Sequence, residues 1–190
     1  MAKQYGFYMD QSNCIGCFTC QIACKDKNDL EVGQCWRKVH EFQGGDTILE
    51  GGVYRSNVFA YWLSMSCNHC QEPKCVQNCP AGAMYKREED GIVLVDQNKC
   101  LGCGYCTWSC PYGAPKLAGK TVSKCNFCID LLEQGKNPAC VDACIMRVIE
   151  FGPIDELRAK YGNVDEVKGL PSAQITKPCI VISPHKKAIE

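Results

Sequence analysis

Apolar residues are grouped into short stretches along this chain, several of them bounded by glycine or aspartate. Residues 4–9 (QYGFYM) predict a short strand, and residues 51–63 (GGVYRSNVFAYWL), rich in β-branched and aromatic side chains, predict a longer one. Residues 90–96 (DGIVLVD) predict an apolar strand that is opened by a turn, whereas residues 19–29 (TCQIACKDKND) predict a helix. We therefore expect short strands mixed with short helices.

A further helix is predicted over residues 151–163 (FGPIDELRAKYGN). Pro153 suits the first helical position and Gly162 suits the end, while acidic residues near the start and basic residues near the end favour the helix dipole. Its apolar face would consist of Ile154, Leu157 and Tyr161. This pattern predicts a packing helix rather than a functional one.

The charge pattern excludes several classes of protein. The 190 residues include 21 basic and 21 acidic side chains, so the net charge is zero and no basic patch for nucleic acid or anionic lipid stands out. The longest uncharged stretch, 56–71, has only 16 residues and contains polar side chains, so no membrane span is expected. The N-terminus lacks the apolar region of an export signal.

The cysteines are the most informative residues of the sequence. There are 18 of them, and sixteen fall into four groups. Group one is Cys14, Cys17, Cys20 and Cys24; group two is Cys67, Cys70, Cys75 and Cys79; group three is Cys100, Cys103, Cys106 and Cys110; group four is Cys125, Cys128, Cys140 and Cys144. Cys35 and Cys179 remain and are expected to be ordinary small apolar side chains.

Three kinds of chemistry can explain clustered cysteines. Disulfides suit short secreted chains, and here the Cys-x2-Cys pairs cluster locally instead of bridging distant segments. Zinc takes four thiolates, often as two Cys-x2-Cys pairs, so group four alone is compatible with it. Groups one and three have the spacing C-x2-C-x2-C-x3-C, which with a following proline is the bacterial ferredoxin pattern. We favour iron–sulfur clusters, with zinc as the minor alternative.

Sixteen cysteines at four per cluster predict four 4Fe–4S clusters. In the ferredoxin pattern the fourth cysteine binds the other cluster of a pair. Pro80 and Pro111 directly follow groups two and three, whereas groups one and four lack this proline. We therefore pair group two with group three, and group one with group four. Gly16 and Gly102 lie inside the loops, where a positive φ and close backbone approach are expected.

Groups one and three also form an internal repeat with a spacing of 86 residues. The expected fold is α+β, with two bacterial-ferredoxin-like modules, each holding two 4Fe–4S clusters, and the second module inserted into the first. The outer module is expected at 1–50 and 120–163, the inserted module at 51–119, and an extended C-terminal tail at 164–190.

Little else points to chemistry. His40, His69 and His185 are expected to be structural or solvated, and Tyr105 and Trp108 are expected to shield a cluster from water. There is no nucleotide-binding glycine motif and no recognisable pair of nucleophile and base. We therefore predict no catalytic residues. Clusters held entirely by cysteine leave no iron open to a substrate, which indicates electron transfer.

The whole sequence resembles the iron–sulfur subunits of complex molybdopterin oxidoreductases, and most of all the iron–sulfur subunit of the dimethyl sulfoxide reductase type. The resemblance lies in the four cysteine groups and in QYGFYMD, VFAYWLSMSCNHC, CPYGAPK, FGPIDELRAKYG and TKPCIVI. It implies an electron-transfer subunit that is not catalytic alone. It also implies two partners: an integral membrane anchor subunit that oxidises menaquinol, and a molybdopterin catalytic subunit that reduces S-oxides or N-oxides in anaerobic respiration.

The resemblance further implies an order of clusters. Electrons would pass from cluster 4 (Cys100, Cys103, Cys106 and Cys79) to cluster 3 (Cys67, Cys70, Cys75 and Cys110), then to cluster 2 (Cys125, Cys128, Cys140 and Cys24), and last to cluster 1 (Cys14, Cys17, Cys20 and Cys144). The nitrate reductase type has tryptophan where this chain has Cys103, so a full four-iron cluster is implied there.

Two alternatives stay open at this point. The chain could serve another molybdoenzyme or a hydrogenase, or it could be a free polyferredoxin. The resemblance also implies membrane association through the anchor subunit. The protein would lie either on the periplasmic face, exported as a passenger of a twin-arginine partner, or on the cytoplasmic face.

Overall fold

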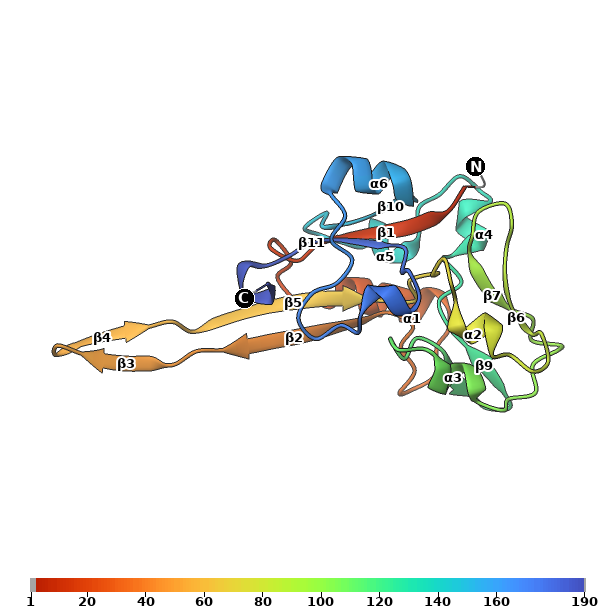
Figure 1. The fold of residues 1–190 in the computed structure, drawn as a ribbon, viewed down its shortest axis with the longest axis horizontal. Coiled ribbons are helices and arrows are strands. Elements are labelled where there is room, and N and C mark those ends of the chain that lie inside the picture. Colours follow the sequence, from red (N-terminus) through yellow and green to blue (C-terminus); the bar gives the residue numbers. More distant parts are fainter. Residues whose placement is uncertain (1–2, 190) are drawn as a thin grey trace.

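The computed structural model describes residues 3–189 and is organised around a three-stranded sheet of order β10-β1-β11. Strand β1 (Tyr5–Asp10) lies in the middle, antiparallel to β10 (Ile149–Pro153) and parallel to β11 (Ile180–Ser183). The sheet therefore joins the beginning of the chain to two segments near its end (Figure 1). The strand predicted over 4–9 is confirmed with a shift of one residue.

Helix α6 (Ile154–Tyr161) packs against all three strands of this sheet. It begins directly after Pro153, and its apolar side chains, Leu157 among them, form a small core against the sheet. The ring of Tyr161 stacks on that of Tyr8 with 3.6 Å between the centroids. The predicted packing helix and its apolar face are thus confirmed.

Antiparallel two-stranded pairs supply the rest of the β structure between residues 3 and 189. They are β2 (Lys38–Gly44) with β5 (Phe59–Met65), β3 (Thr47–Glu50) with β4 (Val53–Ser56), β6 (Met84–Lys86) with β7 (Val93–Val95), and β8 (Lys116–Ala118) with β9 (Thr121–Ser123). The strand predicted over 51–63 is therefore two strands. The ladder breaks at Asn57, whose side-chain oxygen accepts a hydrogen bond from the backbone amide of Asp46 at 2.7 Å.

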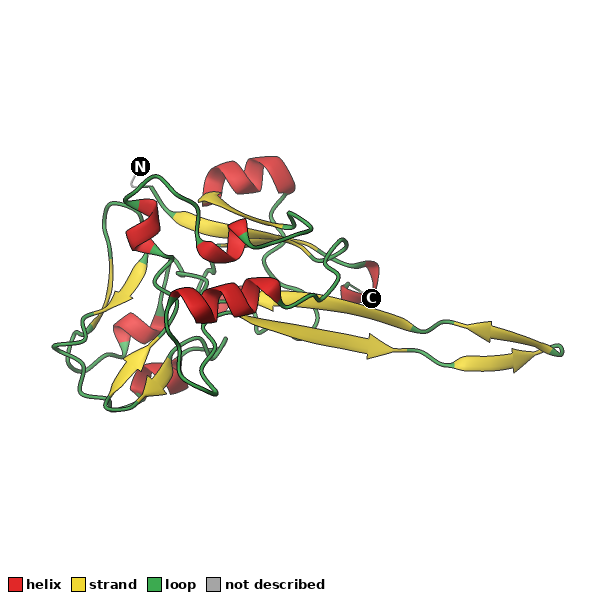
Figure 2. Cartoon of the chain, turned by 180° about the vertical axis from the view of Figure 1, so that it is seen from behind, coloured by secondary structure: helices red, strands yellow, loops and turns green. Residues whose placement is uncertain are grey.

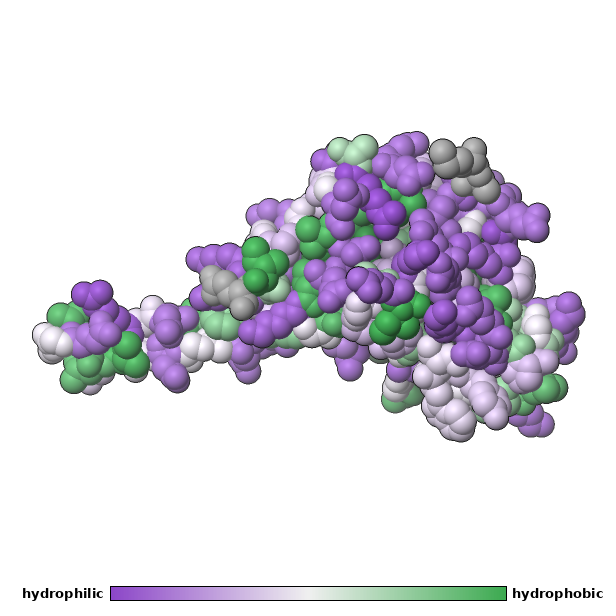
Figure 3. Space-filling model, in the orientation of Figure 1, coloured by the Kyte–Doolittle hydropathy of each residue, from purple (hydrophilic) through white to green (hydrophobic). Residues whose placement is uncertain are grey.

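Residues 38–65, which we call the arm, form two of these pairs end to end and project far from the body (Figures 1 and 2). At the base Val39 and Leu63 are buried, but every residue of β3 and β4 is exposed. Figure 3 shows apolar side chains at the tip, where Leu49 is 60% and Tyr54 is 75% exposed. A hairpin of two strands without cover is marginally stable, so the tip adds little to the stability of the body.

The helices that lie within the cysteine groups are short. They are α1 (Thr19–Lys27), α2 (Lys74–Gln77), α3 (Tyr105–Ser109), α4 (Ile129–Leu132) and α5 (Ala139–Asp142). Two 3₁₀ turns, Ala173–Ile175 and Lys186–Ala188, occur near the C-terminus. Helices this short hold little stability of their own, so their positions depend on packing and on whatever the cysteines bind.

Phe127 lies at the centre of the main core and is fully buried. Its ring stacks on Phe7 at 4.2 Å and meets the edges of His69 and Phe151 at 5.0 Å and 6.1 Å. These contacts connect the central sheet to the loop of group two. Cysteines of groups one and four pack in this main core, whereas Cys75 and Cys106 of groups two and three pack in a separate, smaller core.

The fold is a small mixture of helices and strands built around cysteine-rich loops, as expected for the α+β class. The division into an outer module, an inserted module and a tail stays a prediction. Within the segment predicted as a tail, strand β11 (Ile180–Ser183) is buried in the central sheet. Across the described residues no helix has both the length and the apolar character needed to cross a membrane.

Candidate metal centres

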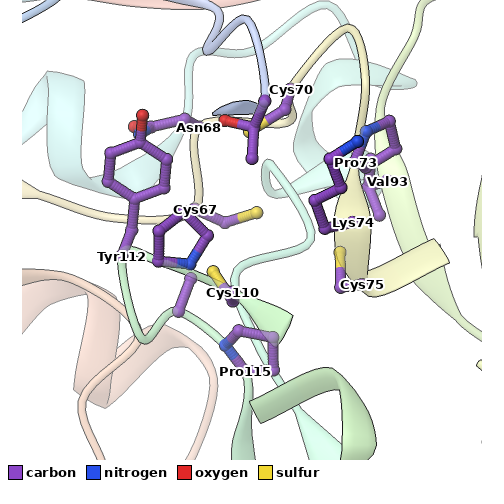
Figure 4. A pocket seen from close by; sticks show the side chains of 13 residues that line it. Cys67, Asn68, Cys70, Pro73, Lys74, Cys75, Val93, Cys110, Tyr112 and Pro115 are labelled. Atoms are coloured by element: carbon purple, nitrogen blue, oxygen red, sulfur yellow. The ribbon is translucent and has the colours of Figure 1, made fainter. Parts of the chain in front are cut away.

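Cysteines of groups two and three meet around a small cavity. The cavity is lined by Cys67, Cys70 and Cys75 of group two and by Cys110 of group three, and its remaining wall includes Val93 and several prolines. Figure 4 shows the sulfur atoms of Cys67, Cys75 and Cys110 pointing toward a shared space. We call these four cysteines the group-two set.

A second small cavity is lined by cysteines of the first and the last cysteine group. Cys14, Cys17 and Cys20 come from group one, and Cys144 comes from group four. These four cysteines are the group-one set. Because β10 follows group four and pairs with β1, which precedes group one, the central sheet brings the two groups together.

A third small cavity lies beside the β6-β7 and β8-β9 pairs. It is lined by Cys100, Cys103 and Cys106 of group three and by Cys79 of group two, which together form the group-three set. The three cavities are of similar volume and have the same ring of four sulfurs. They therefore suit occupants of the same kind and size.

The remaining four cysteines, Cys24, Cys125, Cys128 and Cys140, form the group-four set and are all buried. Burial raises the pKa of the Cys24 thiol to about 12, and the nearby Cys140 and Cys128 also act to raise it. Burial raises the pKa of Cys125 as well, with added contributions from Cys24 and Cys140. The sulfur atoms are thus close enough to influence one another, as helices α1 and α5 pack together.

These sets fit iron–sulfur clusters by the chemistry of their donors. Four thiolates in apolar surroundings are unfavourable unless a bound cation neutralises them. In the part of the chain that the structure describes, no three His, Cys, Asp or Glu side chains lie close enough to hold a single metal ion. A 4Fe–4S cluster is held by four cysteine thiolates, which is the number of cysteines in each set.

Two glycines allow the loops of groups one and three to close. Gly16 and Gly102 have φ of +65° and +64°, as the sequence predicted. A Cβ atom at Gly102 would lie 2.2 Å from the carbonyl oxygen of Lys120, and one at Gly16 would lie 2.5 Å from the ring of Trp62. Both loops therefore require glycine for conformation and for space.

Backbone amides and hydroxyl groups are directed at several sulfur atoms. The amides of Met84, Val122, Phe127 and Val148 donate to the sulfurs of Cys79, Cys100, Cys125 and Cys144, each at 3.4 Å. The hydroxyl of Thr19 donates to Cys17 at 3.3 Å, and the hydroxyl bond lowers the pKa of that thiol. Donors of this kind stabilise thiolate ligands and tune the potential of a bound cluster.

The four sets differ in their access to solvent. Cys17 of the group-one set and Cys103 of the group-three set are exposed, whereas all cysteines of the group-four set are buried. The group-two set is also buried apart from Cys110, which is partly exposed. Two sets thus reach the surface, and the other two lie inside the protein.

Exposed apolar side chains lie on or near the segments of both sets that reach the surface. The group-one rim consists of Ile15, Phe18 and Met146, and the group-three rim consists of Leu101, Tyr105 and Trp108. Tyr105 and Trp108 contact each other edge to face at 5.7 Å, but Trp108 is 78% exposed and neither side chain lines the cavity. The expected shielding of the cluster by these two rings is therefore not provided within this chain.

The other candidates from the sequence have ordinary roles. His69 is fully buried, and its Nδ1 accepts a hydrogen bond from the amide of Val93 at 3.0 Å, while burial holds its pKa well below 6.5. His185 accepts a bond from the amide of Lys187, and His40 is exposed. Cys179 is fully buried beside the sheet, and Cys35 is half-buried and lies outside the four sets.

Sequence reasoning missed two buried cations near the sulfurs, Arg37 and Lys124. The Lys124 ammonium donates to the backbone carbonyls of Val93 and Cys125. Arg37 lies directly before β2, where a basic residue is usually solvated. No local pattern marks either residue, because tertiary packing alone brings them to the cysteines.

Comparison with known proteins adds an independent finding. Residues 58–154 match the family model described as a 4Fe-4S dicluster domain. The sequence is 51% identical over 187 residues to the B subunit of anaerobic dimethyl sulfoxide reductase of Escherichia coli K12, covering 97% of this chain and 91% of that protein. It is 44% identical over 189 residues to the protein of the same name from Haemophilus influenzae, covering 98% and 92%.

A more distant relative carries a different name. The thiosulfate reductase electron transfer subunit of Salmonella typhi is 38% identical over 161 residues, covering 82% of this chain and 79% of that protein. The similarity to the two dimethyl sulfoxide reductase proteins runs over nearly the full chain. It therefore includes the arm and the central sheet as well as the cysteine groups.

Proposed function

This protein belongs to the family of iron–sulfur B subunits of dimethyl sulfoxide reductase, and from this premise we propose that it is the electron-transfer subunit of a reductase complex. It carries four 4Fe–4S clusters and is not catalytic alone. The observation that carries the proposal is the set of three similar cavities, each ringed by four cysteines from two different groups.

We propose that each set of four cysteines holds one cluster. Cluster 1 is assigned to the group-one set, cluster 2 to the group-four set, cluster 3 to the group-two set and cluster 4 to the group-three set. The support is twofold: the spacing pairs groups one with four and two with three, and three cavities have the matching linings. Each cluster, when bound, takes up and releases one electron at a time.

The residues of this chain have three tasks in that function. The cysteines hold the clusters, the amide and hydroxyl donors tune them, and the buried core keeps water from the inner sets. We propose that electrons enter at the group-three set and leave at the group-one set. The proposal is supported by the exposure of Cys103 and Cys17, since these are the two exposed cysteines among the four sets.

We propose two partner subunits, one at each exposed set. A molybdopterin catalytic subunit that reduces an S-oxide or N-oxide would cover the group-one rim, and an integral membrane anchor that oxidises menaquinol would cover the group-three rim. The relatives named as B subunits of dimethyl sulfoxide reductase support an assembly of several subunits. The apolar side chains of both rims suit burial in an interface.

Membrane association would then come from the anchor subunit, and the proposal is compatible with either face of the membrane. The nesting of one ferredoxin-like module inside another remains part of the same proposal. It is supported by the central sheet, whose strands lie before group one and after group four.

The test is to purify the full chain anaerobically with the proteins that accompany it. We expect about sixteen irons and as much sulfide per chain, together with a large molybdenum-containing protein. Zinc at about four per chain without colour would contradict the cluster assignment. If the chain is monodisperse, holds its clusters and co-purifies with no molybdenum-containing protein, this result would contradict its role as a subunit.

A further inference from the structure

Arg37 is buried between the group-one and group-four sets, with only 2% of its surface exposed. None of the salt bridges found among residues 3–189 involves it. A guanidinium group is always charged in proteins, and burying it without a counter-ion is expensive. The position of Arg37 therefore needs a source of negative charge other than a carboxylate.

The guanidinium group is held in a fixed place. Its Nη1 donates to the carbonyl and hydroxyl oxygens of Ser64, both at 3.1 Å, and its Nη2 donates to the hydroxyl of Ser66 at 3.0 Å. The central carbon of the group lies 4.8 Å from the centroid of the Phe7 ring. The Nε atom is buried and has no hydrogen-bond partner within the described chain, so this donor remains unsatisfied.

The groups that surround Arg37 are cysteines from both sets, and its backbone amide donates a hydrogen bond to the sulfur of Cys24. Burial acts to lower the pKa of Arg37, yet electrostatic interactions with four cysteines raise it above its ordinary value: Cys140, Cys20, Cys125 and Cys24. The Ser64 hydroxyl that accepts from Arg37 also lies 3.3 Å from the sulfur of Cys20. One cation therefore faces ligands of two neighbouring sets.

We propose that Arg37 is a built-in counter-ion for the clusters of the group-one and group-four sets and raises the reduction potential of both. The proposal rests on the function and the ligand sets proposed above. A cluster held by four thiolates is negatively charged, and reduction adds one more negative charge. A fixed cation in a medium of low dielectric stabilises the reduced form more than the oxidised form.

The location of Arg37 gives this charge a specific consequence. It faces the last two sets on the proposed route, and the four cysteines that raise its pKa all belong to those two sets. Electrons would therefore be drawn toward the exit end of the protein. The two sets at the entry end would keep potentials that do not depend on Arg37.

The experiment replaces Arg37 with a neutral side chain of similar length and measures potentials, not turnover. In Arg37→Met the full chain, purified with its clusters, is titrated with redox mediators and followed by electron paramagnetic resonance. We expect the equilibrium constant for one-electron reduction of at least one of the two clusters to fall about tenfold, which corresponds to about 59 mV. Arg37→Lys should keep most of the wild-type potential, because it keeps the charge.

Arg55→Met serves as the matched control, because Arg55 is an exposed side chain on the arm and should leave all four potentials unchanged. If Arg37→Met does not retain its clusters, Arg37→Gln is measured instead. It removes the same charge but keeps an amide group that can donate hydrogen bonds to Ser64 and Ser66. Unchanged potentials, or an equal shift of all four clusters, would overturn the proposal. A chain without about sixteen irons would instead contradict the proposed function itself.

Discussion

At the scale of single residues, the role of each cysteine depends on the side chains that lie near it in the folded protein and not on its neighbours in sequence. Cys103 is exposed and lines the cavity of the group-three set, whereas Cys35 lies outside the four sets. Both cysteines lie on loops. Substituting each one in turn therefore distinguishes the loss of a cluster ligand from the general effect of removing a thiol.

We predict that Cys103→Ser removes or converts one cluster and leaves the other three intact. An oxygen ligand is a poorer partner for iron in a site built for thiolates. Electron paramagnetic resonance and iron analysis would detect the change, and Cys35→Ser should keep the spectrum and iron content of the wild type. The loss of a different cluster in Cys103→Ser would contradict the ligand sets.

Glycine offers a second comparison at this scale. Gly102 and Gly119 both have positive φ, at +64° and +61°, but only Gly102 lies against backbone, while nothing lies within 4 Å of a Cβ at Gly119. We predict that Gly102→Ala lowers the iron content by about four per chain, because the group-three loop cannot close. Gly119→Ala should cost only about 1 kcal/mol of backbone strain and keep all four clusters. Equal iron content in both variants would rule out this role of Gly102.

Much of the site was predictable from sequence at this scale, because cysteine spacing reports local loop geometry. The pairing of groups predicted which cysteines lie together, and three cavities have the corresponding linings, although the ligation itself stays a prediction. Arg37 could not be predicted. Its partners Ser64 and Ser66 lie on or just after β5, and only the pairing of β2 with β5 brings them to it.

At the scale of elements, the arm is separate from the core that holds the cysteines. The base strands are paired from Lys38↔Met65 to Gly44↔Phe59, and the tip beyond them is exposed throughout. The sequence predicted one strand over 51–63 because its apolar and aromatic residues are continuous. The break arises from the Asn57 side chain, whose bond to Asp46 only the folded hairpin provides.

We predict that the tip can be removed without harm to the fold. Replacing residues 45–58 with Asn-Gly, a favourable two-residue hairpin turn between the paired Gly44 and Phe59, should leave the iron content and the melting temperature unchanged within experimental error. Anaerobic thermal unfolding followed by the colour of the clusters would measure this. A marked fall in melting temperature would mean that the tip supports the body.

At the scale of the whole molecule, the central sheet is where the two ends of the chain are joined. Strand β11 was not predicted, because its four residues lie among prolines and its partner is a parallel strand far away in sequence. Ile182 of this strand is 0% exposed, while Ile189 a few residues later is 67% exposed. The two isoleucines therefore provide matched positions inside and outside the core.

We predict that Ile182→Ala lowers the free energy of unfolding by about 2–5 kcal/mol, since it leaves a cavity in the core. Ile189→Ala should change it by no more than about 0.5 kcal/mol, as is usual for exposed positions. Melting temperatures of the two loaded variants would give the comparison. Similar values for both would mean that β11 is not part of the core that supports the clusters.

The order of strands in this sheet also affects how the protein is made. Strand β1 leaves the ribosome long before its partners, because β10 and β11 both lie beyond residue 148. The group-one set likewise lacks its fourth cysteine until Cys144 has been translated. Three early thiols therefore lack the fourth cysteine of their cavity until all the other cysteine groups have been synthesised, so the group-one set is completed late in translation.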